Sequence, residues 1–147
     1  MSNLSDYVTD DATGQNWRLM LGDSCERLAE LAENSVDLSV YSPPFASLFT
    51  YSPSLRDLGN SSDRQEFVEH YGYIIREVLR LTKPGRISCV HVQQLTTSKA
   101  THGVMGLSDF RGDVIRAHQE AGWTFHGEVT VNKDPQAQAI RTKSHAL

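Results

Sequence analysis

The feature that most constrains the fold is a β-rich run that ends abruptly at two consecutive prolines. Residues 36–41 (VDLSVY) have the composition of a buried parallel strand, and Ser42-Pro43-Pro44-Phe45 follows directly. Because proline has no backbone N–H and a fixed φ, the chain must leave the sheet here. Residues 46–61 then form a long loop, and a loop of this length in a compact domain is commonly functional. The sequence therefore predicts a buried strand with a rigid turn and a functional loop at its carboxyl end.

Strand and helix patterns alternate along the chain. Strands are predicted over residues 17–21, 36–41, 86–92 and 123–131. Helices are predicted after Asp23, from Ser62 to the residues before Lys83, and from Asp109 to Gly122. Residues 93–107 are expected to be a polar loop. This β-α-β-α-β-α-β order predicts the α/β class, as a Rossmann-like, doubly wound and mostly parallel sheet. In such a sheet, the loops at the carboxyl ends of the strands are the expected site of chemistry.

Length and composition limit the chain to one domain of a water-soluble type. Its 147 residues can bury a core, with residues 1–15 expected as a flexible N-terminus and residues 16–147 as the domain. Apolar residues at 39% and charged residues at 22% exclude a collagen-like or disordered chain. With no apolar run of about 18 residues and no secretory signal, we expect a cytoplasmic protein. Cys25 and Cys89 are expected to be reduced, partly buried thiols. The net charge of −4 argues against a nonspecific nucleic-acid coat but permits a local basic groove.

Four short segments follow one another in an order that resembles an enzyme family. They are Leu21–Cys25 (LGDSC), Asn34–Leu38 (NSVDL), Ser42–Phe45 (SPPF) and Val78–Gly85 (VLRLTKPG). Over roughly residues 17–143 the chain resembles the amino-methylating DNA methyltransferases, and especially phage-type members with the catalytic tetrapeptide near the N-terminus. The resemblance implies a methyltransferase fold that uses S-adenosylmethionine. It also implies methyl transfer to the exocyclic amine of cytosine or adenine in DNA, as in restriction-modification systems.

The resemblance assigns catalysis to Ser42, Pro43, Pro44 and Phe45. An exocyclic amine is a poor nucleophile, because its lone pair is delocalised into the ring. Its methylation needs hydrogen-bond acceptors for the amine and a base flipped out of the duplex. The Ser42 hydroxyl and the Pro43 carbonyl can supply acceptors on a rigid turn, and Phe45 offers a stacking face worth about 1–3 kcal/mol. Serine at the first position favours cytosine N4 over adenine N6. The alternative is a Pro-Pro turn that closes a strand, with a core phenylalanine.

Other residues have weaker assignments. In the family, the acid corresponding to Asp23 lies near the adenosine part of the cofactor; Asp23 is also placed to be a helix N-cap, and both roles can hold. We expect His91 to be a core histidine with a backbone partner rather than a catalytic base. No histidine or cysteine set has metal-ligand spacing, so no metal site is predicted. A solvated end is expected, with phosphate contact as the alternative, for Lys133, Arg141, Lys143 and His145.

One part of the family pattern is missing from this sequence. The chain has ten glycines but no aromatic-x-Gly-x-Gly loop for the cofactor, and no segment large enough for target recognition. We therefore expect residues 16–147 to be the catalytic side of a methyltransferase domain. Its S-adenosylmethionine site would be incomplete, and it would be inactive alone. The implied partners are double-stranded DNA with a flipped target base, the missing C-terminal portion of the same enzyme, or a second copy of the chain.

Two rival functions remain. The first is a non-catalytic module that keeps the methyltransferase fold and binds DNA or a partner chain; the missing glycine loop supports it. The second is a Rossmann-type nucleotide binder of unrelated chemistry, which the lack of a GxGxxG or P-loop motif disfavours.

Overall fold

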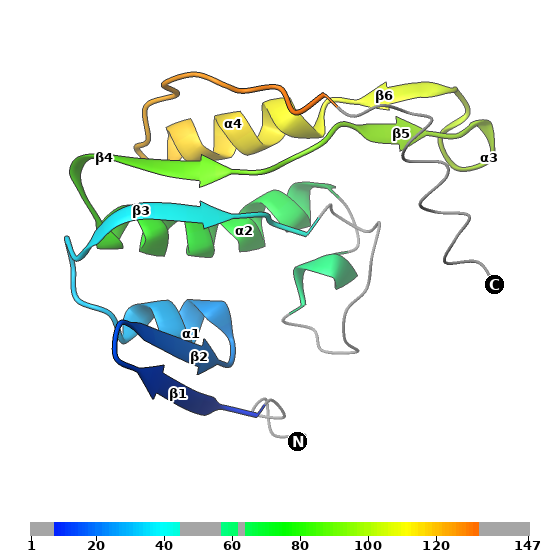
Figure 1. The fold of residues 1–147 in the computed structure, drawn as a ribbon. Coiled ribbons are helices and arrows are strands. Elements are labelled where there is room, and N and C mark those ends of the chain that lie inside the picture. Colours follow the sequence, from blue (N-terminus) through cyan, green and yellow to red (C-terminus); the bar gives the residue numbers. More distant parts are fainter. Residues whose placement is uncertain (1–7, 45–56, 62–63, 133–147) are drawn as a thin grey trace.

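The computed structural model describes residues 8–44, 57–61 and 64–132 (Figure 1). The strands are β1 (Asp10–Gly14), β2 (Trp17–Leu21), β3 (Val36–Tyr41), β4 (Thr82–Val90), β5 (Leu95–Thr97) and β6 (Gly106–Ser108). The helices are α1 (Ser24–Ala29), α2 (Arg64–Leu81), α3 (Lys99–His102) and α4 (Phe110–Glu120), with the 3-10 helix η2 (Leu58–Asn60) before α2. The mixed α/β class predicted from the sequence is confirmed.

Among the described residues, the strands form three two-stranded sheets rather than one continuous sheet. β3 and β4 pair in parallel, with Leu38 opposite Ile87 and Val40 opposite Cys89. β1 and β2 form an antiparallel pair, and so do β5 and β6. The parallel pair is the element expected of a Rossmann-like fold, and the doubly wound sheet is present only in part.

Three segments differ from the sequence-based expectation. Residues 10–14, inside the N-terminal segment expected to be flexible, form β1, because a two-residue turn lets them pair with β2. β5 and β6 lie within or next to the stretch expected to be a polar loop. Residues 123–132 contain no strand, so the strand predicted over 123–131 is wrong. A strand needs a neighbour for its backbone hydrogen bonds, and no described strand pairs with this segment.

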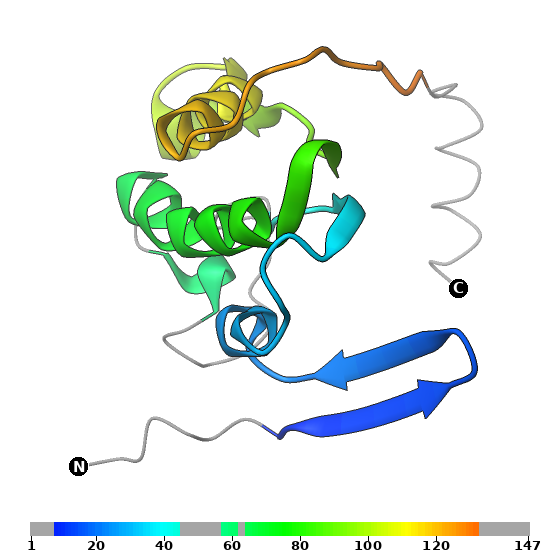
Figure 2. The same cartoon turned by 90° about the vertical axis from the view of Figure 1, so that its left-hand side faces the viewer.

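The core lies between two helices and one face of the β3–β4 sheet. Figure 2 shows α2 and α4 on the same side of these strands. Phe67, Tyr71 and Ile75 of α2 recur every fourth residue and are fully or almost fully buried. They pack against three residues of α4, namely Phe110, Val114 and Ala117. Both amphipathic helices are thus confirmed.

The helix ends follow the predicted capping residues. The Cys25 N–H donates to Asp23 Oδ1 at 2.8 Å at the start of α1, and the Gly112 N–H donates to Asp109 Oδ1 at 3.1 Å at the start of α4. Gly122, with φ +107°, follows the end of α4 and stops that helix. Within the described part of the chain, every helix is too short or too polar to cross a membrane.

No helix of the described residues covers the other face of the β3–β4 sheet, which we call the open face. Leu38, Val40 and Ile87 are 58%, 71% and 52% exposed, and their pairing register puts them on one face. The residues between them point to the helices, where Tyr41 and Val90 pack against the core. Parallel strands are normally covered on both faces. The prediction of buried parallel strands therefore holds for one face only, because both covering helices lie on the same side.

Candidate functional site

The predicted catalytic turn begins where β3 ends. Ser42 is exposed, Pro43 is buried and Pro44 is half-buried, so the prolines are packed and Ser42 is accessible. Phe45, the fourth residue of the predicted tetrapeptide, lies outside the described residues, as do the four basic or histidine residues predicted in the C-terminal tail. The turn therefore has a packed base and an accessible first residue.

Two hydrogen bonds fix the start of the turn against the end of β4. The His91 N–H donates to the Tyr41 carbonyl at 2.9 Å, and the Ser42 hydroxyl donates to the His91 carbonyl, also at 2.9 Å. A hydroxyl has one hydrogen and two acceptor lone pairs. Because that hydrogen points to His91, the Ser42 oxygen is oriented to accept hydrogen bonds from other groups.

The prediction that His91 is a core histidine is wrong. β4 ends at Val90, and the His91 side chain is exposed. Strand alternation explains this result, since positions 87, 89 and 91 share the open face of the sheet. The backbone N–H and carbonyl of His91 are the partners of Tyr41 and Ser42.

A cavity of about 1040 Å³ brings the two predicted parts of the site together. Asp23 lines it from the turn between β2 and α1, and Ser42, Pro43 and Pro44 line it from the end of β3. Tyr71 closes one side from α2. Small-molecule sites in proteins typically occupy about 300–1,000 Å³, so the space is sufficient for a cofactor-sized ligand.

Asp23 acts as an N-cap at the edge of this cavity. Gly22, with φ +148°, makes the sharp turn that leads from β2 into the cap. The carboxylate is half-buried and accepts the Cys25 N–H, so the capping prediction is confirmed. Its second predicted role, toward a cofactor, stays a prediction. Neither cysteine forms a disulfide; Cys25 is half-buried as expected, and Cys89 is exposed on the open face of the sheet.

Three hydrogen-bonded side chains, one buried and two half-buried, lie behind the predicted catalytic turn, and the sequence did not predict this arrangement. The Tyr71 hydroxyl donates to the Tyr41 hydroxyl at 3.4 Å, and Tyr41 Oη lies 3.1 Å from His118 Nε2. His118 Nδ1 lies 2.7 Å from the Val114 carbonyl, which can only accept. Nδ1 therefore holds the hydrogen, and Nε2 accepts from Tyr41. The only sequence signal was the position of His118 one turn after Val114, on the helix side that faces Tyr41.

Desolvation favours the uncharged forms of these three side chains. It lowers the pKa of His118, and it raises the pKa of both tyrosines. Their hydrogen bonds join α2, β3 and α4 at the residue that precedes Ser42. The turn is therefore attached to the core through Tyr41.

Comparison with known proteins identifies similar structures but no matching family model. No protein-family model matches this sequence, and no curated protein matches it at a significant level. Crystal structures of a candidate DNA modification methylase from Thermus thermophilus do share its fold. One superposes with a TM-score of 0.53 at 28% identity, covering 69% of this chain and 39% of the methylase. Its selenomethionine form gives 0.54 at 21% identity, covering 76% and 46%.

A third structure of the same methylase is complexed with S-adenosyl-L-methionine. It superposes with a TM-score of 0.57 at 24% identity, covering 76% of this chain and 47% of the methylase. The chain thus spans less than half the length of the protein it matches. The similarity confirms that this chain has the fold of one part of a methylase-like α/β protein.

Proposed function

We propose that this chain is the catalytic-side part of an S-adenosylmethionine-dependent DNA methyltransferase that acts on an exocyclic amine. The observation that carries the proposal is the orientation of the Ser42 hydroxyl. Its hydrogen is donated to the His91 carbonyl, so its lone pairs are acceptors at the edge of a ligand-sized cavity. The ordered sequence motifs and the similarity to the Thermus methylase support the same assignment.

The proposed chemistry of the turn is to orient an amine. An exocyclic N–H group donates to the Ser42 oxygen and a second N–H to the Pro43 carbonyl, which directs the nitrogen lone pair toward the methyl donor. The prolines hold these acceptors in place before the base arrives. Phe45 follows in the sequence and provides the stacking face for the flipped base.

The cavity and Asp23 fit part of S-adenosylmethionine. When bound, this cofactor supplies a methyl group made electrophilic by its sulfonium. A carboxylate suits the hydroxyl donors of a ribose, so Asp23 would hold the adenosine part. The sequence contains no glycine-rich loop for the remainder. We therefore propose that the cofactor site is completed by another polypeptide segment.

The open face of β3 and β4 supports a need for further chain. More than half of the Thermus methylase has no counterpart here, and the exposed Leu38, Val40 and Ile87 leave a parallel sheet uncovered. We propose that the remaining part of the enzyme covers this face, with double-stranded DNA as substrate. A second copy of this chain is the alternative cover.

The target base is tested by analysing modified nucleosides. Mass spectrometry of DNA from cells that express the native gene product is expected to detect N4-methylcytosine, since serine begins the tetrapeptide. N6-Methyladenine instead would move the target to adenine. Detection of 5-methylcytosine alone, or of no methylated base, would contradict the proposal.

Ser42→Ala tests the catalytic turn. We expect at least a hundredfold loss of methyl transfer, the order of effect seen when one preorganised hydrogen-bonding group is removed from a site. Ser35→Ala, in an exposed turn where the hydroxyl donates to the Ala32 carbonyl, is the matched control and retains activity. Equal activity of the two variants would remove Ser42 from the mechanism.

Asp23 can be tested for its two roles separately. Asp23→Asn keeps an oxygen that caps α1 but removes the charge, whereas Asp23→Ala loses both. If Asp23 binds cofactor, both variants weaken S-adenosylmethionine binding to the native gene product, and only Asp23→Ala loses about 1 kcal/mol of stability. Unchanged cofactor affinity in both variants would leave capping as its only role.

A non-catalytic module remains the alternative function, because the glycine-rich loop is missing. Such a module would bind DNA or a partner chain with the same fold. Methylation of DNA by the native gene product that is lost in Ser42→Ala excludes this alternative. DNA binding without any methylation favours it.

A further inference from the structure

The hairpin formed by β5, α3 and β6 projects from the fold near the catalytic turn. The Ser42 hydroxyl is bonded to His91 at the end of β4, and β5 begins shortly afterwards at Leu95. Figure 1 shows the hairpin beyond the end of β4, on the side toward which β3 and β4 run. It therefore lies where a substrate entering at the turn would extend.

The tip of this hairpin is apolar and exposed. Val104, Met105 and Leu107, which we call the hairpin tip, are 64%, 84% and 69% exposed. Lys99 and His102 of α3 adjoin the tip and are also exposed. Neighbouring exposed apolar side chains rimmed by polar ones typically mark an interaction site.

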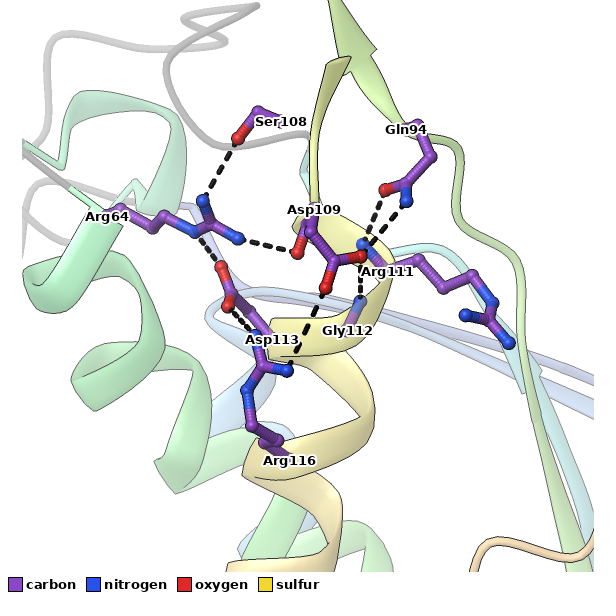
Figure 3. Close-up of polar contacts among 8 residues, drawn as sticks. All are labelled: Arg64, Gln94, Ser108, Asp109, Arg111, Gly112, Asp113 and Arg116. Atoms are coloured by element: carbon purple, nitrogen blue, oxygen red, sulfur yellow. Dashed lines mark hydrogen bonds and ion pairs between the residues drawn. The ribbon is translucent and has the colours of Figure 1, made fainter.

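A network of side chains fixes the base of the hairpin (Figure 3). Arg64 of α2 donates to Ser108 Oγ at 3.0 Å and to the Asp109 carbonyl, at the end of β6. Gln94, just before β5, donates to Asp109 Oδ1 at 3.0 Å and accepts the Arg111 N–H at 3.0 Å. Two three-residue strands are not stable alone, so these contacts hold the hairpin to α2 and α4. The tip is thus presented from a preorganised base, which lowers the entropic cost of binding.

The charge of this region favours a polyanionic partner. The protein has a net charge of −4, yet no aspartate or glutamate occurs from Val78 to Ser108. The hairpin segment that carries Lys99 and His102 contains no aspartate or glutamate of its own. The exposed carboxylate at the base of the hairpin, Asp109, accepts from Gln94 and Gly112 and lies 3.8 Å from an Arg116 nitrogen. A phosphate backbone can therefore approach the tip itself without meeting a carboxylate of the hairpin.

We propose that the hairpin tip contacts the bases of duplex DNA beside the catalytic turn. This inference rests on the proposed function. Base faces are the apolar surface of a nucleic acid, and apolar side chains pack against or between base steps in many complexes. A two-stranded ribbon also fits the width of the major groove. In this arrangement Val104 and Met105 pack against the stack next to the flipped base, and Lys99 contacts phosphate.

The test measures duplex binding by this chain with a fluorescently labelled duplex. The double variant Val104→Ser/Met105→Ser is expected to bind at least fivefold more weakly, with the same dependence on salt, because no charge has changed. Lys99→Gln is expected to weaken binding and reduce the salt slope by about one. Leu19→Ser, which replaces a 65% exposed leucine in β2, and Arg76→Gln, an exposed cation on α2, are the matched controls and bind like the wild-type chain.

Further measurements distinguish a loss of DNA binding from misfolding and from failure of the proposed methylation. Circular dichroism and the thermal midpoint should be unchanged in the tip variant, because its side chains are exposed. Wild-type affinity in the tip variant, or no binding of the wild-type chain to any duplex, would overturn the hairpin inference and leave the proposed methylation standing. Tip-dependent binding without methylation by the native gene product would support the hairpin inference and contradict the proposed methylation. A tip variant that alters only chain–chain association would assign the tip to a protein contact and refute the inference.

Discussion

The His91 carbonyl determines how Ser42 can act. By accepting the hydroxyl hydrogen at 2.9 Å, it leaves the Ser42 oxygen as an acceptor, which is the role that the proposed amine substrate requires. The carbonyl is itself held in position because the His91 N–H donates to Tyr41. The backbone of His91, whose side chain is exposed, therefore orients the Ser42 hydroxyl.

His118 makes the stability of the protein depend on pH. Burial lowers the pKa of His118 below its usual value near 6.5, so the folded state favours the neutral ring that accepts from Tyr41. The unfolded chain takes up the proton first as the pH falls. The His118 contribution is therefore complete above about pH 6.5 and is lost as the pH falls toward the folded pKa. We expect the free energy of unfolding, measured with urea, to decrease from pH 7 to pH 5.

Two glutamine variants check the assignment to His118. His118→Gln keeps hydrogen-bonding atoms but cannot titrate, so the pH dependence between 7 and 5 should flatten. His102→Gln, at an exposed histidine of α3, should leave that dependence unchanged. If both variants keep the wild-type slope, another group titrates in this range.

The residue types predicted the turn after β3, but not the hydrogen bonds of Tyr41 that attach this turn to the core. The tandem prolines predicted where the chain leaves β3, since their effect on the backbone is local. The Tyr41–His118 pair joins residues far apart in sequence, and no local pattern reports such a contact. His91 was misplaced because strand alternation indicates that residues share a face, not which face is covered.

At the scale of elements, the network in Figure 3 joins two helices and the β5–β6 hairpin around Asp109. The Asp109 carboxylate caps α4 through Gly112 and accepts from Gln94, and the latter hydrogen bond is the main cause of its lowered pKa. Gly112 makes room for this arrangement, because a Cβ added there would lie 2.0 Å from Asp109 Oδ2. Glycine is thus used inside a helix for space rather than for backbone freedom.

Gly112→Ala is expected to destabilise the protein by about 1 kcal/mol, although alanine is the better helix former. The new methyl group displaces the Asp109 carboxylate, and loss of an N-cap costs about 0.5–2 kcal/mol. In an Asp109→Ala background the same change should have no destabilising effect. A double-mutant cycle in urea measures this coupling.

Gly72→Ala in α2 is the matched control. The nearest atom to its added Cβ is Arg76 Nη1 at 3.2 Å, the end of a flexible side chain. This variant should gain about 0.5–1 kcal/mol from helix propensity. Destabilisation that persists in the Asp109→Ala background would show that another neighbour of Gly112 is responsible.

Elements with a strong periodic pattern were predicted well, and elements that depend on a partner were not. The apolar residues of α2 recur at helical spacing, and that pattern needs no knowledge of the rest of the chain. β5 and β6 have only three residues each, too few for a periodic pattern, and the Asp109 network holds their ends together. Residues 123–131 have an alternating sequence but no described strand beside them.

For the whole molecule, the open sheet face is the main departure from a finished α/β fold. Both large helices, α2 and α4, cover one side of β3 and β4 (Figure 2). Leu38, Val40 and Ile87 are exposed on the other side. A monomer rarely leaves such a face in contact with water. We therefore expect this chain alone to self-associate with increasing concentration in sedimentation velocity experiments.

Val40→Lys should shift this association toward monomer, because a charge at the centre of the face is costly to bury. Val129→Lys adds the same charge at a valine that is 91% exposed in the extended segment after α4, and it should associate like the wild-type chain. A wild-type chain that stays monomeric at every concentration would contradict the prediction that the open face of β3 and β4 mediates self-association. Equal effects of the two variants would attribute the change to net charge.

The binding of S-adenosylmethionine by this chain alone is the final prediction at this scale. Methyl transfer needs acceptors for the amine, a pocket for the base and a cofactor held in line with the nitrogen. The proposed site has Ser42 and Pro43 for the first requirement, but only Asp23 and part of a cavity wall for the last. No glycine-rich loop brings backbone N–H groups to the cofactor, and each 1.4 kcal/mol lost lowers affinity about tenfold. Isothermal titration calorimetry should therefore detect no tight binding and methylation assays no product, until a polypeptide with such a loop is added. Micromolar binding by this chain alone would mean that the cofactor site lies elsewhere in the fold.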